Sequence, residues 1–162
     1  MEHNVRVLFV CLGNICRSPI AEGMFHAAAQ ERGLPCVIDS AGTAAYHVGG
    51  RPDPHAISIA SSHGINISGQ SARQVERNDF YRFDHIIAMD RANLEGLRAK
   101  APRDATAKLS MLLDLVHGRE GQGVADPYYG EMADFEAALF TISLGVDAWI
   151  DRLQREASVF RA

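Results

Sequence analysis

Short apolar runs alternate along the chain with longer stretches of helix-forming residues. The apolar runs predict buried strands over residues 5–10, 37–38 and 84–89. The other stretches, rich in Ala, Glu, Met and Gln or opened by a capping residue, predict helices over 20–31, 54–63 and 91–99. Strands that alternate with helices predict a parallel sheet covered on both faces.

The last third of the chain carries one weak signal and one strong signal. Residues 107–113 fit a fourth strand, although their Met and Leu content leaves a helix open. Beyond them, one long amphipathic helix is indicated by apolar residues at every third or fourth position: Phe135, Leu139, Ile142, Val146, Trp149 and Leu153. We expect this stripe to pack against the sheet.

The most informative segment follows the first predicted strand and reads Cys11-Leu12-Gly13-Asn14-Ile15-Cys16-Arg17-Ser18. Ser18-Pro19 predicts a helix start, with serine as the cap and proline at the first helical position. A cysteine therefore opens a loop at the carboxyl end of a strand, where ligands bind in such folds. The backbone N–H groups of the loop can converge on one anion at the helix N-terminus.

This arrangement predicts cysteine-dependent hydrolysis of a phosphate ester. A helix N-terminus and a neighbouring cation favour the thiolate, so Cys11 would attack phosphorus in line. The loop N–H groups and the guanidinium of Arg17 would hold the equatorial oxygens. We expect Gly13 to let the backbone turn, and Ser18 to donate its hydroxyl to the thiolate, which competes with capping. The alternative is that Cys11 is only a small buried residue at a strand end.

A leaving group needs a proton, and the loop contains no acid. The best candidate is Asp126, which precedes Pro127 and the adjacent tyrosines Tyr128 and Tyr129. Those rings could wall an aromatic substrate. A general acid contributes about 10²–10⁴ in rate, although an Asp-Pro pair on its own is most often only a turn.

Composition and charge limit the other functions open to the chain. Its 162 residues, 47% hydrophobic and 22% charged, predict one globular domain over 1–162. The net charge of -4 indicates no surface for nucleic acid or an anionic membrane, and no apolar segment has the length of a membrane span. Three cysteines, with no zinc-type spacing, predict a cytoplasmic protein without metal. No cofactor is expected, because the loop and Arg17 supply positive potential.

Taken together, the motifs resemble those of the low-molecular-weight protein tyrosine phosphatases over nearly the whole chain. The resemblance rests on VLFVCLGNICRSPIAEGMF at 7–25, DSAGT at 39–43, RPDPHA at 51–56, HGI at 63–65, ARQV at 72–75 and ADPYYG at 125–130. It implies a three-layer α/β/α fold with a four-stranded parallel sheet and a phosphate-binding loop between the first strand and the first helix. It also implies a phosphotyrosine-containing protein as substrate, and inorganic phosphate or vanadate as inhibitors.

The resemblance also implies roles for individual residues. Cys11 would be the nucleophile, Arg17 the phosphate clamp, and Asp126 the general acid and then the base for the attacking water. The phosphate would be bound by Leu12, Gly13, Asn14, Ile15, Cys16, Arg17 and Ser18. The network that supports the loop would comprise Asn14, Ser18 and Ser40. The slot for the phosphotyrosine ring would be lined by Leu12, Tyr46, Tyr128 and Tyr129.

Two positions depart from the family pattern, and one cysteine stays ambiguous. Mammalian members carry a histidine of the asparagine network where this chain has Gln70, and a tryptophan where it has Tyr46. Both changes bear on substrate preference more than on the reaction. The resemblance supports a reversible disulfide between Cys11 and Cys16 that protects the nucleophile, but a small packing residue fits Cys16 equally well. Cys36 is expected to be inert core.

Three other functions share part of this pattern. Arsenate reductase shares the fold and the loop, but its thioredoxin-coupled form needs two further cysteines, and residues 37–162 contain none. Protein-arginine phosphatase carries threonine where Ile15 stands, and an apolar side chain suits an aryl phosphate better. A catalytically dead phosphotyrosine-binding module is expected to lack Cys11 or Asp126, and both are present.

Two polar features outside these motifs complete the analysis. The charge-rich run 73–82 predicts a solvated surface. Asp90 is interpreted first as a helix cap and second as a partner for a group near the strand end.

Overall fold

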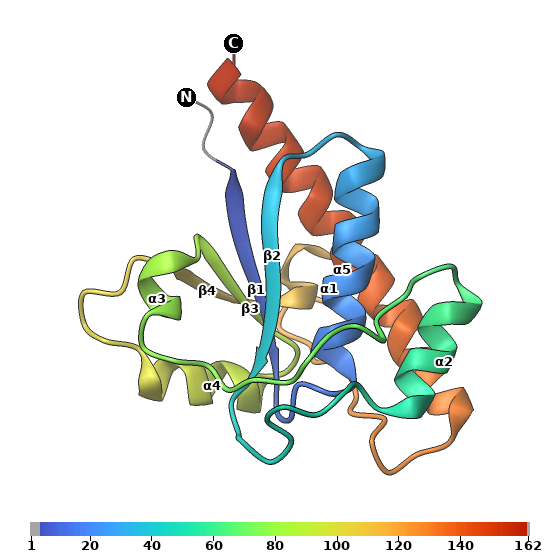
Figure 1. The fold of residues 1–162 in the computed structure, drawn as a ribbon. Helices are drawn as coiled ribbons and strands as arrows, with labels where there is room; N and C mark the ends of the chain where they lie inside the picture. Colours follow the sequence, from blue (N-terminus) through green and yellow to red (C-terminus); the bar gives the residue numbers. More distant parts are fainter. Residues whose placement is uncertain (1–3, 162) are drawn as a thin grey trace.

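Within residues 4–161, which the computed structural model describes, parallel strands form one sheet in the order β2–β1–β3–β4 (Figure 1). The strands are β1 (Val5–Cys11), β2 (Cys36–Gly42), β3 (His85–Ala88) and β4 (Lys108–Met111). The helices are α1 (Arg17–Glu31), α2 (Pro54–Ser62), α3 (Asp79–Arg82), α4 (Arg91–Lys100), the 3-10 helix η1 (Leu112–Leu115) and α5 (Met132–Arg161). The four-stranded parallel sheet expected from the sequence is confirmed.

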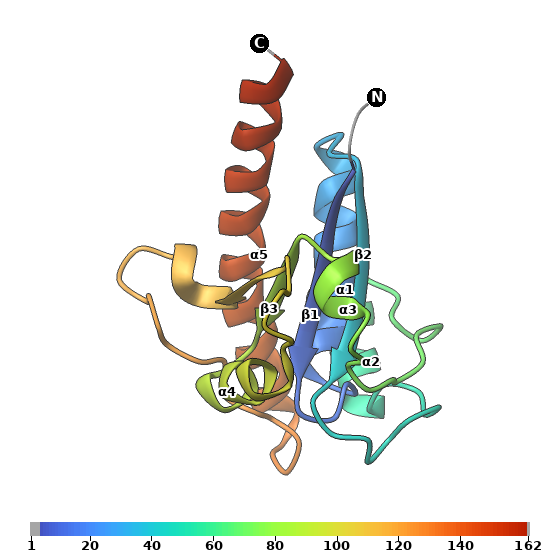
Figure 2. The same cartoon turned by 90° about the vertical axis from the view of Figure 1, so that its left-hand side faces the viewer.

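Alternating side chains of β1 enter two separate cores, one on each face of the sheet. Val7 and Phe9 pack with residues of α1, α2 and α5, whereas Leu8 and Val10 pack with residues of α3 and α4. This alternation follows from the two-residue period of a strand. Figures 1 and 2 show the resulting three layers, with α1, α2 and α5 on one side of the sheet and α3 and α4 on the other.

The strand order places the end of β1 at a topological switch point. β1 is central, and the chain proceeds from it first to β2 on one side and later to β3 on the other. A crevice opens where neighbouring connections leave a parallel sheet in opposite directions. Cys11 is the last residue of β1 and therefore lies at this crevice.

The amphipathic helix predicted for the C-terminal part is α5. All six residues of its apolar stripe are buried in the same core as Val7 and Phe9. The indole Nε1–H of Trp149 donates to the carbonyl of Leu112 at 3.0 Å, which ties α5 to η1. None of the helices within the described residues is both long and apolar enough to cross a membrane.

Three element boundaries differ from the sequence-based expectations. α1 begins at Arg17, with Cys16 as the N-cap and no side-chain cap, so the predicted capping by Ser18 is wrong. β2 continues to Gly42, because residues 36–42 pair in register with all of β1. Residues 107–113 divide between β4 and η1, so both readings of that segment hold in part.

Candidate active site

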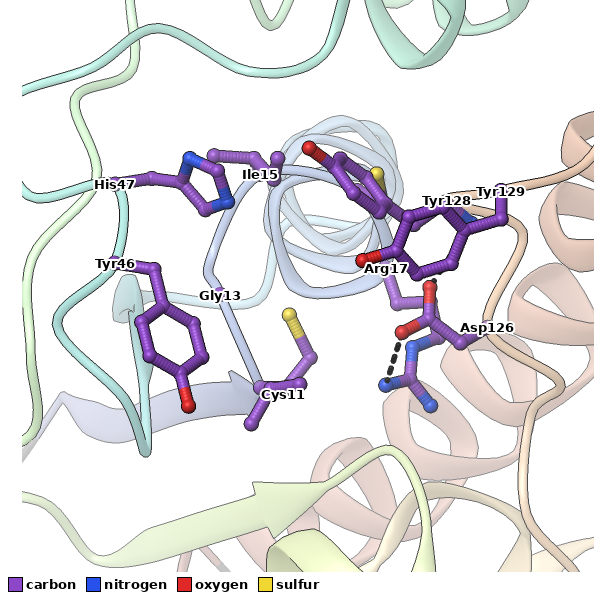
Figure 3. A pocket seen from close by; sticks show the side chains of 11 residues that line it. Cys11, Gly13, Ile15, Arg17, Tyr46, His47, Asp126, Tyr128 and Tyr129 are labelled. Atoms are coloured by element: carbon purple, nitrogen blue, oxygen red, sulfur yellow. Dashed lines mark hydrogen bonds and ion pairs between the residues drawn. The ribbon is translucent and has the colours of Figure 1, made fainter.

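The segment that links β1 to α1, here called the Cys11 loop (residues 11–18), folds around a small pocket. Cys11 at its start and Arg17 near its end are buried, 3% and 2% exposed respectively. Figure 3 shows the sulfur of Cys11 in the middle of the pocket, with Tyr46 and His47 on one side and Asp126 on the other. The structure thus brings the predicted cysteine, arginine and aspartate to one place.

The sharp turn of the Cys11 loop occurs at Asn14 and not at Gly13 as expected. Asn14 has φ 57°, in the left-handed region, and asparagine tolerates this region because its short side chain can hydrogen-bond locally. Gly13 serves a different purpose, since a Cβ built there would lie 3.0 Å from Cδ2 of His47. The glycine therefore leaves room for the His47 ring beside the loop.

The side chain of Asn14 is the centre of the network that supports the loop. Its Oδ1 accepts the backbone N–H of Arg73 at 3.0 Å, which fixes the orientation of the amide. Its Nδ2 donates to the hydroxyls of Ser18 and Ser40, at 2.9 and 3.0 Å. Asn14, Ser18 and Ser40 are therefore joined as the resemblance implied, and Arg73 is an additional member.

The hydroxyl of Ser18 lies 3.0 Å from the sulfur of Cys11. Asn14 donates to this hydroxyl oxygen, and once Cys11 is a thiolate the hydrogen between Ser18 and the sulfur can come only from the Ser18 hydroxyl. The side chain that was expected to divide between capping and the thiolate makes no cap bond and contacts the sulfur.

The guanidinium of Arg17 is held in place by groups from distant parts of the chain. Its Nη1 donates to Oδ2 of Asp90 at 2.7 Å and to the carbonyl of Val124 at 2.8 Å. The other carboxylate oxygen of Asp90 accepts the N–H of Asn93 at 2.8 Å and caps α4. Asp90 therefore has both of the roles considered from the sequence.

Asp126 faces the same guanidinium from the opposite wall of the pocket. Its Oδ2 lies 3.4 Å from Nη2 of Arg17, and its Oδ1 accepts the N–H of Tyr128 at 3.1 Å (Figure 3). The second bond closes a short turn that fixes the direction of the carboxylate. One oxygen of the Asp126 carboxylate, Oδ2, therefore points into the pocket above the loop.

Aromatic side chains surround the mouth of the pocket, and we call Tyr46, His47, Tyr128 and Tyr129 the aromatic rim. Tyr128 and Tyr129 meet edge to face at 4.7 Å between ring centroids, and His47 lies 5.9 Å from Tyr128. Tyr46 is 76% exposed and Tyr129 is 96% exposed. The pocket is lined by Cys11, Leu12, Gly13, Ile15, Cys16, Arg17, Tyr46, His47, Asp126, Tyr128 and Tyr129.

The second thiol of the loop differs from Cys11 in its surroundings. Burial, reinforced by Asp53 and other negative neighbours, raises the pKa of the Cys16 thiol far above its usual range. Cys16 is thus a protonated thiol at neutral pH. All three cysteines are free in this structure, and Cys36 is half-buried in β2.

Two residues of the site were not anticipated. Glu22 accepts the hydroxyl hydrogen of Ser40 at 2.6 Å, and burial raises the pKa of the Glu22 carboxyl. Its partner Ser40 lies 18 positions away, so no local pattern in the sequence links the two residues. His47 also lines the pocket, and no sequence motif indicated this. Gln70 lies outside the Asn14 network, since its Nε2 donates to the carbonyl of Pro19.

The prediction that residues 73–82 form a solvated surface holds only in part, because Glu76, Arg77 and Arg82 are exposed but Asp79 is not. Asp79 is fully buried and accepts hydrogen bonds from the guanidinium of Arg73 at 2.9 and 3.1 Å. The sequence pattern of a charged run is the same whether its side chains are solvated or form ion pairs inside the fold. Here the run folds against the end of β2, so that Arg73 and Arg82 pair with Asp79 while Glu76 and Arg77 stay exposed.

Comparison with known proteins agrees with this geometry. Residues 6–159 match the family described as low molecular weight phosphotyrosine protein phosphatase. The phosphatase of that name from Schizosaccharomyces pombe is 42% identical over 133 residues, covering 80% of this chain and 85% of the relative.

Two solved structures have the same fold. Bacillus subtilis YfkJ has a TM-score of 0.89 and 39% identity, covering 96% of this chain and 98% of the other. The Drosophila arginine phosphatase DARP has a TM-score of 0.85 and 32% identity, covering 90% and 96%. The chain therefore belongs to the low molecular weight phosphotyrosine protein phosphatase family of cysteine-dependent hydrolases.

Proposed function

We propose that this phosphatase hydrolyses phosphotyrosine in proteins through a phosphocysteine intermediate on Cys11. The observation that carries the proposal is the convergence of the Cys11 sulfur, the Arg17 guanidinium and the Asp126 carboxylate on one pocket at a helix N-terminus. A phosphate that enters this pocket meets the thiolate, the loop residues 12–18 and a fixed cation. These are the groups that in-line phosphoryl transfer needs.

In the first step, the Cys11 thiolate attacks phosphorus, and a sulfur–phosphorus bond forms as the bond to the aryl oxygen breaks. The leaving oxygen takes a proton from the Asp126 carboxyl, which lies on the wall opposite the sulfur. Arg17 neutralises charge on the equatorial oxygens and is already oriented by Asp90 and Val124. Little reorganisation is then required during the reaction.

In the second step, water attacks the phosphocysteine and Asp126 takes the proton from it. The sulfur leaves as a thiolate, and phosphate is released. The hydroxyl of Ser18, 3.0 Å away, donates to this sulfur and makes it a better leaving group.

The aromatic rim supports phosphotyrosine as the substrate. Leu12, Tyr46 and Tyr128 offer apolar and aromatic surface to a flat ring. The named relatives are phosphotyrosine phosphatases, and phosphoprotein substrates follow from the family. Inorganic phosphate and vanadate, which have the shape of the transferred group, should compete for the same loop.

Phosphoarginine is the alternative substrate, because the fold is shared with the Drosophila arginine phosphatase. Ile15 favours the aryl ester, since its buried apolar side chain lines the pocket beside the phosphate loop. A guanidino group would meet no polar partner there. Arsenate reduction is less favoured, because no cysteine follows Cys36 to carry the oxidising equivalents away.

Steady-state hydrolysis of p-nitrophenyl phosphate, a phosphotyrosine peptide and a phosphoarginine peptide, without added metal, tests the proposal. We expect turnover of both aryl esters, inhibition by vanadate, and no turnover by Cys11→Ser, which should still bind phosphate or vanadate. Preference for phosphoarginine would transfer the function to that substrate. Activity retained by Cys11→Ser would refute the phosphocysteine mechanism.

We further propose that residues 1–162 form a single domain that acts in the cytoplasm without nucleic acid or membrane as a partner. One sheet organises both cores of the described residues, which supports a single domain. A reactive Cys11 must stay reduced, which favours a reducing compartment. The net charge of -4 is unfavourable for binding to polyanions.

A further inference from the structure

The charged cluster around Asp79 lies behind the Cys11 loop, outside the pocket. Asp79 is 0% exposed and accepts four hydrogen bonds. Two come from Nη1 and Nη2 of Arg73, one from Nη2 of Arg82 at 3.1 Å, and one from the N–H of Glu76 at 2.8 Å. The paired, bidentate contact with Arg73 is the strongest geometry available to a buried carboxylate.

The Asp79 contact fixes the side chain of Arg73, and the backbone of the same residue contacts the loop support. The N–H of Arg73 donates to Oδ1 of Asn14 at 3.0 Å, and its carbonyl accepts the N–H of Gly42 at 2.8 Å. Gly42 lies so close to the Cys11 loop that a Cβ built on it would be 2.7 Å from the carbonyl oxygen of Leu12. The backbone of Arg73 is thus hydrogen-bonded on one side to the end of β2 and on the other to Asn14.

The orientation of the Asn14 amide depends on this peptide. With a backbone donor on Oδ1, the amide must present Nδ2 to Ser18 and Ser40. A released amide can rotate and offer its oxygen to Ser18, whose hydroxyl would then donate to Asn14 and no longer to Cys11. Asn14 also has φ 57°, a conformation that persists only where its surroundings hold it.

We propose that Asp79 is a positioning residue for the nucleophile: through Arg73 it holds the Asn14 amide, and through Asn14 it directs the Ser18 hydroxyl to the sulfur of Cys11. The second acid on Arg73, Asp39, accepts from Nε at 3.0 Å but is 42% exposed, so water screens it. The inference rests on the proposed function of Cys11.

The test compares two variants that each remove one partner from the same cluster. Asp79→Asn breaks the charged pair with Arg73, whereas the matched control Arg82→Gln removes the other guanidinium and leaves the path to Asn14 intact. We expect Asp79→Asn to lower kcat about 10-fold with little change in KM, as loss of positioning does. Arg82→Gln should lose thermal stability but keep wild-type kcat, with both variants assayed well below their melting temperatures.

A second readout does not require turnover. Alkylation of Cys11 by iodoacetamide is followed by mass spectrometry across a range of pH. The curve of alkylation rate against pH should shift to higher pH in Asp79→Asn and stay unchanged in Arg82→Gln. If the wild-type protein had no phosphatase activity, the proposed function would fail, but the alkylation rates would still test the role of Asp79.

A double-mutant cycle identifies the route. Asn14→Gly removes the amide and tolerates the positive φ, so adding Asp79→Asn to it should lower kcat by less than about twofold. Full additivity, wild-type kcat in Asp79→Asn, or an equal loss in Arg82→Gln would each overturn the proposal. If Asp79→Asn does not fold, Arg73→Lys, which keeps the charge but not the bidentate contact, must show the same losses, and wild-type behaviour there would overturn it as well.

Discussion

The Cys11 loop and the aromatic rim line the same pocket, but the protein holds them in different ways. Apart from Leu12 and Gly13 the loop residues are buried, and Asn14 and Arg17 are fixed by hydrogen bonds to β2, to the N-cap of α4 and to the segments around Arg73 and Val124. In the rim, by contrast, Tyr46 and Tyr129 are largely exposed, and they lie on two separate loops.

This difference separates the chemistry from substrate choice. In-line transfer needs the sulfur and guanidinium within a fraction of an ångström of one geometry, which only a densely bonded, buried segment maintains. Recognition of an aryl ring tolerates small displacements, so exposed side chains suffice. We therefore expect substitutions of Asp126, or of the loop residues that react or orient the reacting groups, to lower kcat, and substitutions in the rim to change KM.

The largest effect beyond Cys11→Ser is expected for Asp126, which is carried by the rim segment but acts in the chemistry. Asp126→Ala should reduce kcat for a phosphotyrosine peptide about 100-fold, because the phenolate would leave without a proton. The loss for p-nitrophenyl phosphate, whose leaving group needs little protonation, should be much smaller. An equal loss for both substrates would remove Asp126 from the acid role.

A rim substitution should have a smaller effect of a different kind. Tyr46→Ala should raise KM for the phosphotyrosine peptide by about 3- to 10-fold, the range expected for losing one aromatic contact, while kcat stays near wild type. Inorganic phosphate, which has no ring, should inhibit both proteins equally. A fall in kcat for p-nitrophenyl phosphate would show that the rim also positions the reacting groups and would break the comparison.

The support of the loop predicts a pH-dependent stability. Burial raises the pKa of Glu22 above its ordinary value of 4.5, so the folded protein binds more protons than the unfolded chain just above that pH. The contribution of Glu22 to stability should therefore decline as pH rises from 4.5 through the raised value. Two charged side chains also act on the pKa of Glu22: Asp39 in β2 raises it, and Arg73 behind the loop lowers it. The hydrogen bond from Ser40 lowers it as well.

The measurement for Glu22 is urea unfolding of wild type and Glu22→Gln between pH 4 and pH 7.5. The glutamine keeps an acceptor for Ser40, so kcat should change less than about twofold. The difference in unfolding free energy between the two proteins should shift in favour of Glu22→Gln as pH rises, then level off. A difference that is constant with pH would contradict the assignment.

The smallest effect on turnover is expected for Cys16. Under reducing conditions Cys16→Ser should keep wild-type kcat, because the protonated Cys16 thiol takes no part in the transfer. After peroxide treatment, the variant should recover less activity with added thiol than wild type, since a Cys11–Cys16 disulfide would no longer protect the nucleophile. Equal recovery would argue that Cys16 is only a packing residue.

Much of the fold could be read from local pattern. The strand before the loop, the helix after it and the stripe on α5 were predicted, because strand and helix preferences depend on neighbours a few residues away. Cys11 and Arg17 were identified for the same reason, since they lie six positions apart between a strand and a helix. Asp126 required the family resemblance in addition, because an Asp-Pro turn alone has little specificity.

The tertiary structure decided how the residues are held. Arg17 meets Asp90 and Asn14 meets Arg73 across 73 and 59 positions of sequence, and no local period relates such pairs. Ser18 fits a cap by residue type, yet its hydroxyl lies between the amide of Asn14 and the sulfur of Cys11. The sequence by itself determined which groups are reactive and which elements carry them. Burial, charge pairing and the direction of each hydrogen bond depended on the segments that the sheet brings together, as the enclosed carboxylate of Asp79 illustrates.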